Sequence, residues 1–403
     1  MKNTTKEKME LQDEIPTTAS DFQSVMREMA RDALMGMVKA EVEQLCGPAW
    51  HPDETTGNYR AGSAPSSVYV QGKREAMERP RVRTKGPEGS TETALKTWQL
   101  AKDPSEWEEA MMRAVLCGVS TRKCAGLREH EVLGESKSSL SRLWQRKASE
   151  LVEELQQADL SDYEVLALMI DAVVLSKGLT VTVALGIDVQ GGKRILGYQV
   201  GSSENQVVCE DLLNRLRHRG FKEPKDRSLL VLLDGSKALR NAVLCTFKSA
   251  IIQRCLVHKE RNLKGYLPRK HWKELADCFR KIRKAQGEEE GLEACKELEL
   301  FLSNKNAQAR DSYEEAEEDF LTFHRLNVPN TLNISFLSTN HIENAFKNLR
   351  RHIGRVCRWR KESRQADLWV SSGLMLAEKG FRRIKGYKEI PLLITALEND
   401  HQE

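Results

Sequence analysis

Hydrophobic residues are most concentrated between residues 164 and 258. Two apolar runs dominate this stretch, Val165–Leu175 and Leu229–Leu233. Runs of this length that are rich in Val, Ile and Leu, and are bounded by turn residues, are typical of strands buried on both faces. The same pattern predicts three further strands, over Leu179–Ile187, Arg194–Val200 and Ala250–Leu256. It also predicts two helices, one that opens at Ser203 and one over Lys237–Phe247.

The predicted order is three strands, a helix, a strand, a helix and a strand, which is the order of an RNase H-like α/β fold. The first and fourth strands of that fold are neighbours. Asp171 lies within the first predicted strand and Asp234 directly follows the fourth. A carboxylate in a buried strand is costly unless it is paired, hydrogen-bonded or bound to a metal. The two aspartates therefore predict a shared metal site.

Before this core, apolar residues recur at helical spacing from Asp21 to Leu45 and predict an amphipathic helix. Residues 47–92 are rich in Gly, Pro, Ser and Thr and contain a short predicted strand, Ser67–Gln71. The basic segment Arg79–Lys85 is either a strand or arm that lies on DNA phosphates or a solvated loop.

Three helices are predicted over residues 105–157, with Gly118 and Gly134 between them. This spacing is compatible with a helix-turn-helix whose last helix enters the DNA major groove. A plain helical hairpin is the alternative. Four residues off the apolar face of the last helix are candidate DNA contacts: Lys137, Ser138, Ser141 and Arg142.

After residue 263 the chain becomes acidic and mostly helical, which predicts a helical insertion that is separate from the sheet. A further helix is predicted from Asn340, its expected cap, to Arg351. The basic tract over residues 347–364, which begins within this helix, is a candidate phosphate-binding surface, with a solvated charged face as the alternative. Its candidate DNA contacts are Lys347, Arg350, Arg351, Arg355 and Arg358.

These patterns divide the chain into an α/β core and a mainly helical N-terminal DNA-binding region. The predicted parts are an N-terminal helix and basic arm (1–92), a helix-turn-helix region (93–160), the first part of the core (161–263), an all-helical insertion (264–330), the second part of the core (331–385) and a C-terminal tail (386–403).

Composition adds three limits. The 63 Lys and Arg against 59 Asp and Glu leave a net charge of only +4, which conceals separate basic and acidic blocks. No run of 18 apolar residues occurs, so we expect no membrane span. The nine cysteines include no Cys-x-x-Cys pair, which favours a reducing, cytoplasmic location.

A late carboxylate, Glu343, completes a candidate catalytic trio with Asp171 and Asp234. Carboxylate oxygens suit Mg²⁺, and two such ions could bind the attacking and leaving oxygens at a phosphodiester, with Mn²⁺ able to substitute. Each carboxylate also has a structural alternative: Glu343, for example, could complete a helix cap with Asn340. Asp188 and Glu204 are rival candidates that rank lower, because turns and first helical turns favour acids anyway.

At these residues the chain resembles the Mutator-type bacterial insertion-sequence transposases, a DDE family whose RNase H-like core is interrupted by a helical insertion. The resemblance rests on five stretches, Met169–Asp171, Leu233–Gly235, Gln253–Asn262, Ser338–Glu343 and Ala377–Tyr387. It implies that Asp171, Asp234 and Glu343 are catalytic and that Cys255 and His258 form the short signature of the family.

The resemblance further implies a transposase that binds terminal inverted repeats and target DNA as a homodimer or higher oligomer, associated with the nucleoid when on DNA. It implies cleavage and transfer of strands with Mg²⁺. Two alternatives remain: a catalytically inactive DNA-binding protein derived from a transposase, and an RNase H-like structure-specific nuclease.

Overall fold

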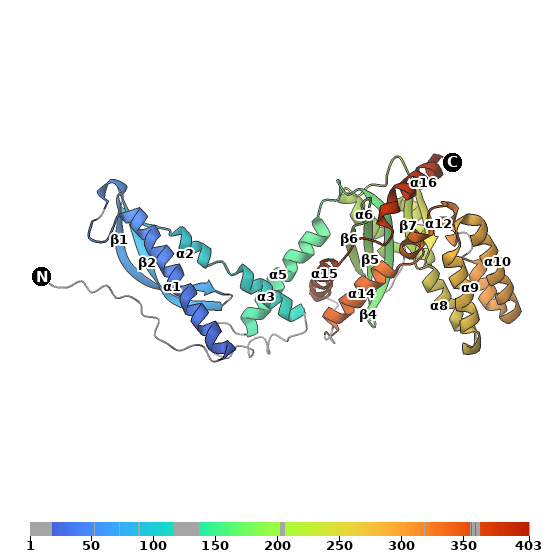
Figure 1. The fold of residues 1–403 in the computed structure, drawn as a ribbon, viewed down its shortest axis with the longest axis horizontal. Helices are drawn as coiled ribbons and strands as arrows, with labels where there is room; N and C mark the ends of the chain where they lie inside the picture. Colours follow the sequence, from blue (N-terminus) through green and yellow to red (C-terminus); the bar gives the residue numbers. More distant parts are fainter. Residues whose placement is uncertain are drawn as a thin grey trace. The chain divides into compact units, whose positions relative to one another are not determined.

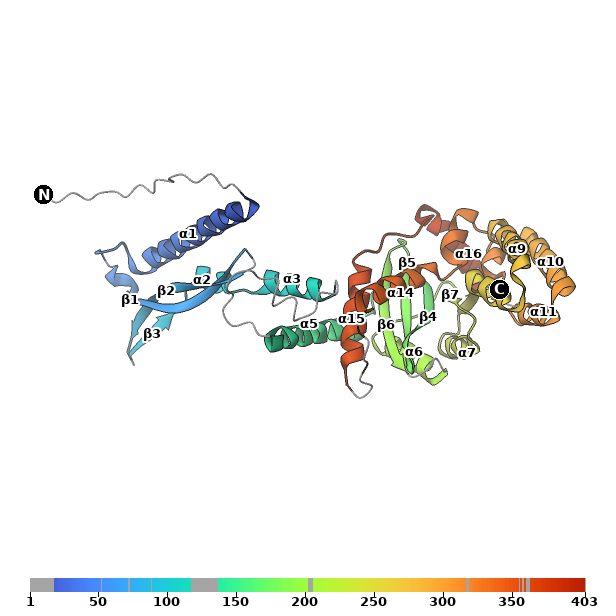
Figure 2. The ribbon, with the colours of Figure 1, turned by 90° about the horizontal axis from the view of Figure 1, so that it is seen from below.

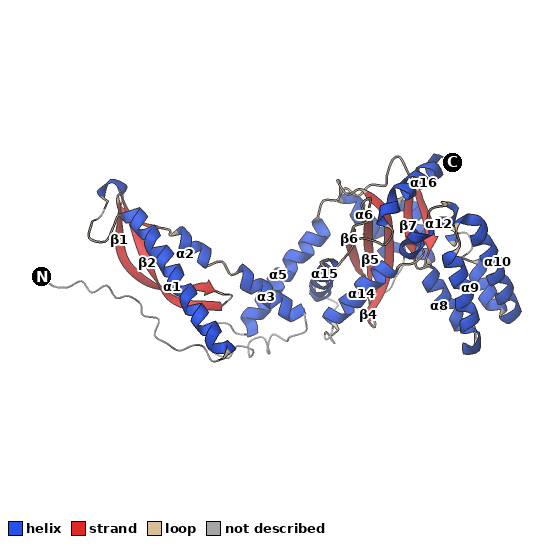
Figure 3. Ribbon diagram, viewed as in Figure 1, coloured by secondary structure: helices blue, strands red, loops and turns tan. Residues whose placement is uncertain are grey.

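The computed structural model describes residues 18–51, 53–71, 73–87, 89–116, 137–201, 206–316, 319–354, 356, 359 and 363–402. The chain divides into two compact units, residues 1–144 and 145–403. Each unit contains one β-sheet, as Figure 3 shows by colour. None of the described helices combines the length and the apolar character that crossing a membrane requires.

In the first unit a long helix packs on a three-stranded antiparallel sheet of order β1-β2-β3 (Figure 1). Val38 and Val42 of the helix meet Val68 and Val82 of the sheet in one buried cluster. The elements are α1 (Ala19–Cys46), β1 (Asn58–Val70), β2 (Lys73–Gly86), β3 (Gly89–Thr93), α2 (Lys96–Ala101), α3 (Ser105–Leu116) and α5 (Lys137–Gln157), which continues into the second unit.

This sheet corrects the expectation of a mainly helical N-terminal region. Residues 58–93 form two long strands and a short one, where the sequence predicted only a strand at 67–71 and a basic strand or arm at 79–85. The alternation was hard to recognise because most residues of β1 are Ser, Gly, Ala and Pro rather than large apolar residues. The basic segment is part of β2, and Arg79 and Arg81 pair with Glu92 of β3.

The predicted helices at 21–45, 106–117 and 137–155 are confirmed as α1, α3 and α5. The middle helix of the expected helix-turn-helix and its turn at Gly134 lie outside the described residues. The helix-turn-helix therefore stays a prediction.

The second unit is built on a five-stranded sheet of order β6-β5-β4-β7-β8. β4, β5 and β6 are antiparallel neighbours, and β7 and β8 run parallel to β4. All five predicted strands are confirmed, although the last ends at Arg254 and not at Leu256. Their bounds are β4 (Val165–Ser176), β5 (Leu179–Asp188), β6 (Lys193–Gly201), β7 (Leu229–Leu233) and β8 (Ala250–Arg254).

Helices cover both faces of this sheet. Leu168 and Ile170 of β4 belong to a cluster formed with α6 (Gln206–His218) and α7 (Lys237–Thr246). Met169 and Val173 belong to the opposite cluster, formed with α14 (Asn340–Ile353) and α15 (Gln365–Glu378), as Figure 2 allows the reader to follow. Because successive side chains of a strand point to opposite faces, Asp171 shares the α14 face with Met169 and Val173.

The predicted insertion is helical but is not separate from the sheet. Its buried residues, among them Phe279, Leu298 and Phe320, join the same hydrophobic cluster as Leu166 and Val181 of the sheet. The helices within residues 264–330 are α9 (Trp272–Lys284), α10 (Gly287–Lys305), α11 (Ala307–Glu314) and α12 (Thr322–Arg325), and α8 (Leu256–Tyr266) and α13 (Asn333–Phe336) adjoin them on either side. Most charged residues of α9 and α10 are exposed, while their buried apolar residues extend the core.

The segment predicted as a C-terminal tail contains a packed helix, α16 (Ile390–Gln402). Ile390, Leu393 and Leu397 are buried in the same cluster. The backbone carbonyl of Leu397 accepts a hydrogen bond of 3.0 Å from the N–H of Ser228, just before β7.

Candidate metal centre beside the end of strand β7

The register of two parallel strands places the two aspartates side by side. β4 and β7 pair from Ala167 opposite Leu230 to Ile170 opposite Leu233. Asp171 and Asp234 are the next residue on each strand. On β7, Leu230 and Leu232 face the α14 side, so the alternation of side chains directs Asp234 toward the same face as Asp171.

Asp171 is a buried carboxylate, with only 4% of its surface exposed. Its Oδ1 accepts a hydrogen bond of 2.8 Å from the N–H of Ala172. Burial, with a smaller contribution from the charge of Asp234, raises the pKa of the Asp171 carboxyl to about 7. A buried carboxylate next to another negative charge is a group that a bound cation stabilises strongly.

Glu343 reaches this place from the first turn of α14, which packs on β4. The helix is capped by Thr339 and not by Asn340, and no side chain makes a capping hydrogen bond there. This finding is against the alternative in which Glu343 belongs to a capping box. Its side chain is 30% exposed, so it lies at the edge of the site and not in the core.

A further side chain, His258, joins Asp171 and Glu343 in a group that could hold a metal. Ligand atoms of Asp171, His258 and Glu343 lie within 4.8 Å of one another. His258 Nε2 is 2.9 Å from Glu343 Oε1, and Arg261 approaches the same oxygen at 3.6 Å. Asp234 is not in this group; its Oδ1 instead accepts a hydrogen bond of 3.0 Å from the N–H of Ser236.

The Cys-x-x-His pair connects helix α8 to helix α14. Cys255 caps α8, and its sulfur accepts hydrogen bonds from the N–H and hydroxyl of Thr339, at 3.3 and 3.4 Å. The Thr339 hydroxyl also lies 3.3 Å from His258 Nδ1. These contacts hold the start of the helix that carries Glu343 against the helix that carries His258.

The same contacts change two ionisation equilibria. The hydrogen bond with Cys255, together with the charges of Cys255, Asp171 and Glu343, outweighs burial and raises the pKa of His258 to about 9. Burial alone would raise the pKa of the Cys255 thiol, but the hydrogen bonds from His258 and Thr339 outweigh it and lower that pKa. A protonated His258 offsets part of the negative charge of the carboxylates around it.

Of the two rival carboxylates, the structure describes only Asp188, and it does not bring Asp188 to this place. Asp188 pairs with Val165 at the beginning of β4, six residues before Asp171. Its Oδ1 accepts hydrogen bonds from the backbone of Gln190 and Gly192, so it organises the turn after β5. Glu204 lies outside the described residues.

The predicted DNA contacts are described only in part. Arg142 is exposed and Ser141 half-buried on α5, which also contains Lys137 and Ser138, whose side chains lie outside the description. On α14, three basic residues are exposed, namely Lys347, Arg350 and Arg351. Arg355 and Arg358 lie outside the described residues.

The sequence alone predicted only a structural role for His258. It follows β8 by four residues, and the first turn of α8 directs it toward Glu343. The Cys-x-x-His spacing was the available signal. It did not identify the partner, because Thr339 is 84 positions from Cys255 in the chain.

Comparison with known proteins gives a consistent picture. A sequence model of the family described as "Transposase, Mutator family" matches residues 1–361. The chain is 27% identical over 343 residues to the transposase for insertion sequence element IS905 of Lactococcus lactis subsp. lactis, covering 82% of this chain and 83% of that protein. The transposase for ISRM5 of Rhizobium meliloti is 28% identical over 342 residues, 81% of each chain. The transposase for IS256 in transposon Tn4001 of Staphylococcus aureus is 31% identical over 192 residues, 44% of this chain and 47% of that protein.

Proposed function

Because this chain belongs to the Mutator family of transposases, we propose that it cleaves the ends of its own insertion sequence and transfers them to target DNA. The observation that carries this proposal is the meeting of Asp171 and Glu343, 172 positions apart in the sequence (343 − 171), next to Asp234. The strand order 6-5-4-7-8, with three antiparallel strands followed by two parallel ones, supports an RNase H-like core for this chemistry.

The donor set fits a divalent cation. Asp171 and Glu343 offer carboxylate oxygens, which Mg²⁺ and Mn²⁺ prefer, whereas His258 could offer a nitrogen to Mn²⁺ only after it loses the proton that its raised pKa favours. Asp234 lies one residue beyond the last pair of β4 and β7, and its carboxylate accepts a backbone hydrogen bond from Ser236. We assign the metal to Asp171, Asp234 and Glu343, with Mg²⁺ as the resident ion and Mn²⁺ as its substitute.

Bound Mg²⁺ ions would lower the pKa of a water or of a 3′-hydroxyl and offset charge on the departing O3′. The residues of this chain would hold the ions in place and leave room for the DNA strand. Asp171 is fixed by its backbone hydrogen bond and by the buried strand around it. Glu343 is held at the edge by the contacts of His258 and Thr339, so a DNA strand can approach from solvent.

Exposed cations next to the site suit a DNA backbone. Lys347 and Arg350 follow Glu343 at i+4 and i+7, which places them along the same side of α14. Together with Arg351 they form a basic face, and none of these three cations is paired with a carboxylate among the described residues. We propose that this face binds DNA phosphates whatever the base sequence. We also propose that α5, with Arg142, contributes to recognition of the inverted repeats, and that the protein acts on them as a homodimer or higher oligomer.

The test is strand cleavage and strand transfer on the element's own ends with Mg²⁺. Asp171→Asn, Asp234→Asn and Glu343→Gln should each abolish both reactions and leave binding to the ends nearly unchanged, because DNA affinity comes from Lys and Arg. Any one of these variants that cleaved at a near-normal rate would remove its residue from the site.

The same assay separates the alternatives. A catalytically inactive DNA-binding protein would bind the ends and leave them uncut in Mg²⁺ and in Mn²⁺. A structure-specific nuclease would cut branched or hybrid substrates without preference for the ends and would join no strands.

A further inference from the structure

Asp234 is the first residue of a tight turn between β7 and α7. Its carboxylate accepts a hydrogen bond from the N–H of Ser236, whose hydroxyl in turn caps α7 by accepting from the N–H of Leu239 at 3.4 Å. Between them Gly235 has a φ of +118°, which residues with a side chain rarely adopt. The direction of the Asp234 side chain therefore depends on the conformation of Gly235.

Arg254 lies directly against this turn. It is the last residue of β8, where it pairs with Leu233 of β7. Its Nη2 donates a hydrogen bond of 3.2 Å to the carbonyl of Gly235. A Cβ built on Gly235 would fall 2.5 Å from both Nε and Nη2 of Arg254. The guanidinium thus packs in the space that the absent side chain of Gly235 leaves.

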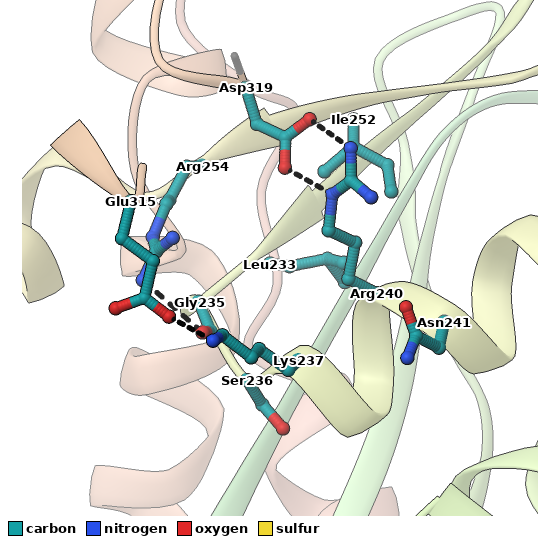
Figure 4. A pocket seen from close by; sticks show the side chains of 10 residues that line it. All are labelled: Leu233, Gly235, Ser236, Lys237, Arg240, Asn241, Ile252, Arg254, Glu315 and Asp319. Atoms are coloured by element: carbon teal, nitrogen blue, oxygen red, sulfur yellow. Dashed lines mark hydrogen bonds and ion pairs between the residues drawn. The ribbon is translucent and has the colours of Figure 1, made fainter. Parts of the chain in front are cut away.

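The surroundings of Arg254 are strongly charged. It lines a cavity of about 230 Å³, which Figure 4 shows with its charged walls. The other cations there are each paired with a carboxylate: Arg240 Nε with Asp319 at 2.6 Å, and Lys237 Nζ with Glu315 at 2.6 Å. Arg254 has no carboxylate ion pair within the described part of the chain.

The charge of Arg254 also reaches the candidate metal centre. Asp234 interacts electrostatically with it, although less strongly than Glu315 and Asp319 do. A cation behind the turn lowers the repulsion between Asp234 and Asp171, which would otherwise drive the two carboxylates apart. The guanidinium thus combines a steric, a hydrogen-bonding and an electrostatic effect on one turn.

We propose that Arg254 is a positioning residue for Asp234, which holds the Gly235 peptide so that the carboxylate stays beside Asp171 and retains its affinity for the metal. The inference rests on the proposed function in that Asp234 is taken as a metal ligand. Arg254 itself touches neither metal nor DNA in this assignment.

The test measures Mn²⁺ binding to the full-length protein by calorimetry, and the Mg²⁺ concentration for half-maximal cleavage. Residues that orient metal ligands typically change metal affinity by about 10- to 100-fold when replaced. Arg254→Gln should weaken Mn²⁺ binding by about tenfold and raise the Mg²⁺ requirement by a similar factor, with cleavage largely restored at high Mg²⁺. DNA affinity and the fold, checked by binding and circular dichroism, should be unchanged.

Two further variants make the test specific. Arg254→Lys keeps the charge but loses the planar fork, so we expect a smaller loss of Mn²⁺ affinity; it also serves as the test if Arg254→Gln does not fold. Arg240→Gln is the matched control, because Arg240 lines the same cavity but its guanidinium pairs with Asp319, and this variant should bind Mn²⁺ like the wild type.

Asp234→Asn distinguishes the positioning role of Arg254 from the metal site itself. If it loses Mn²⁺ while a folded Arg254→Gln and Arg254→Lys bind Mn²⁺ normally, the positioning role of Arg254 is wrong and the proposed function stands. If Asp234→Asn binds Mn²⁺ and cleaves DNA like the wild type, the metal site is wrong and the role of Arg254 with it.

Discussion

Asp171 illustrates what burial does to a single carboxylate. Its folded pKa of about 7 is above the ordinary value of 3.8, so between these values the folded state binds more protons than the unfolded state. The free energy of unfolding of the metal-free protein must therefore fall as pH rises from about 4 to about 7. His258, with a folded pKa of about 9, adds a loss of the same sign as pH rises through that value.

The metal-free protein, kept in EDTA, should lose about 2 kcal/mol of unfolding free energy through Asp171 between pH 5.5 and 8, taking ~1.4 kcal/mol per pKa unit. Asp171→Asn, uncharged throughout, should show a smaller loss over that range. The measurement is urea denaturation of both proteins at several pH values. Parallel curves for the two proteins would mean that Asp171 is already ionised at pH 5.5.

Pairs of elements, not single residues, determine where Glu343 lies. The hydroxyl of Thr339, at the start of α14, contacts Cys255 and His258 of α8. Thr339→Val keeps the shape of the side chain and removes these contacts. It should cost about 1 kcal/mol of stability and slow cleavage several-fold, without weakening DNA binding.

The matched control for that change is Thr182→Val on β5. Thr182 is as deeply buried, but its hydroxyl has no hydrogen-bond partner among the residues that the structure describes. Its position between Val181 and Val183 directs it to the opposite face of the sheet from Asp171. It should leave cleavage unchanged and stability equal or higher. Equal cleavage rates for the two variants would show that the α8–α14 contact does not position Glu343.

The same scale explains what the sequence could predict. β4 and β7 were predictable because their paired residues are buried on both faces: β7 is entirely apolar, and residues 165–175 of β4 are apolar except for Asp171. The N-terminal sheet could not be predicted in full, because small and charged residues occupy most of β1 and β2. The position of His258 could not be predicted from the sequence, because it depends on Thr339, whose position is fixed by packing between α14 and the sheet.

At the scale of the whole molecule, two units have separate cores. This organisation allows recognition of particular DNA ends to be separated from the chemistry that any end must undergo. Arg142 on α5 and Arg350 on α14 are both exposed and test this separation.

Arg142→Ala should reduce discrimination between the element's ends and random duplex, because a contact to a base edge is worth about 1–3 kcal/mol. Arg350→Ala should weaken binding to both duplexes alike and reduce the salt dependence by about one unit of slope. Binding isotherms at several salt concentrations measure both effects. Equal weakening of both duplexes by Arg142→Ala would place the reader of the ends elsewhere, within residues 50–92.

The packing of Arg254 against Gly235 has a genetic consequence. Every glycine codon begins with two guanines, and each single-nucleotide missense change at those positions introduces a residue with a Cβ, which at Gly235 collides with the guanidinium. We expect copies of the gene altered at this codon to encode chains that have lost metal affinity while the separate N-terminal core remains intact. On the proposed function, the ends of such copies would still be substrates for transposase made by intact copies, so the altered copies would move without encoding active enzyme.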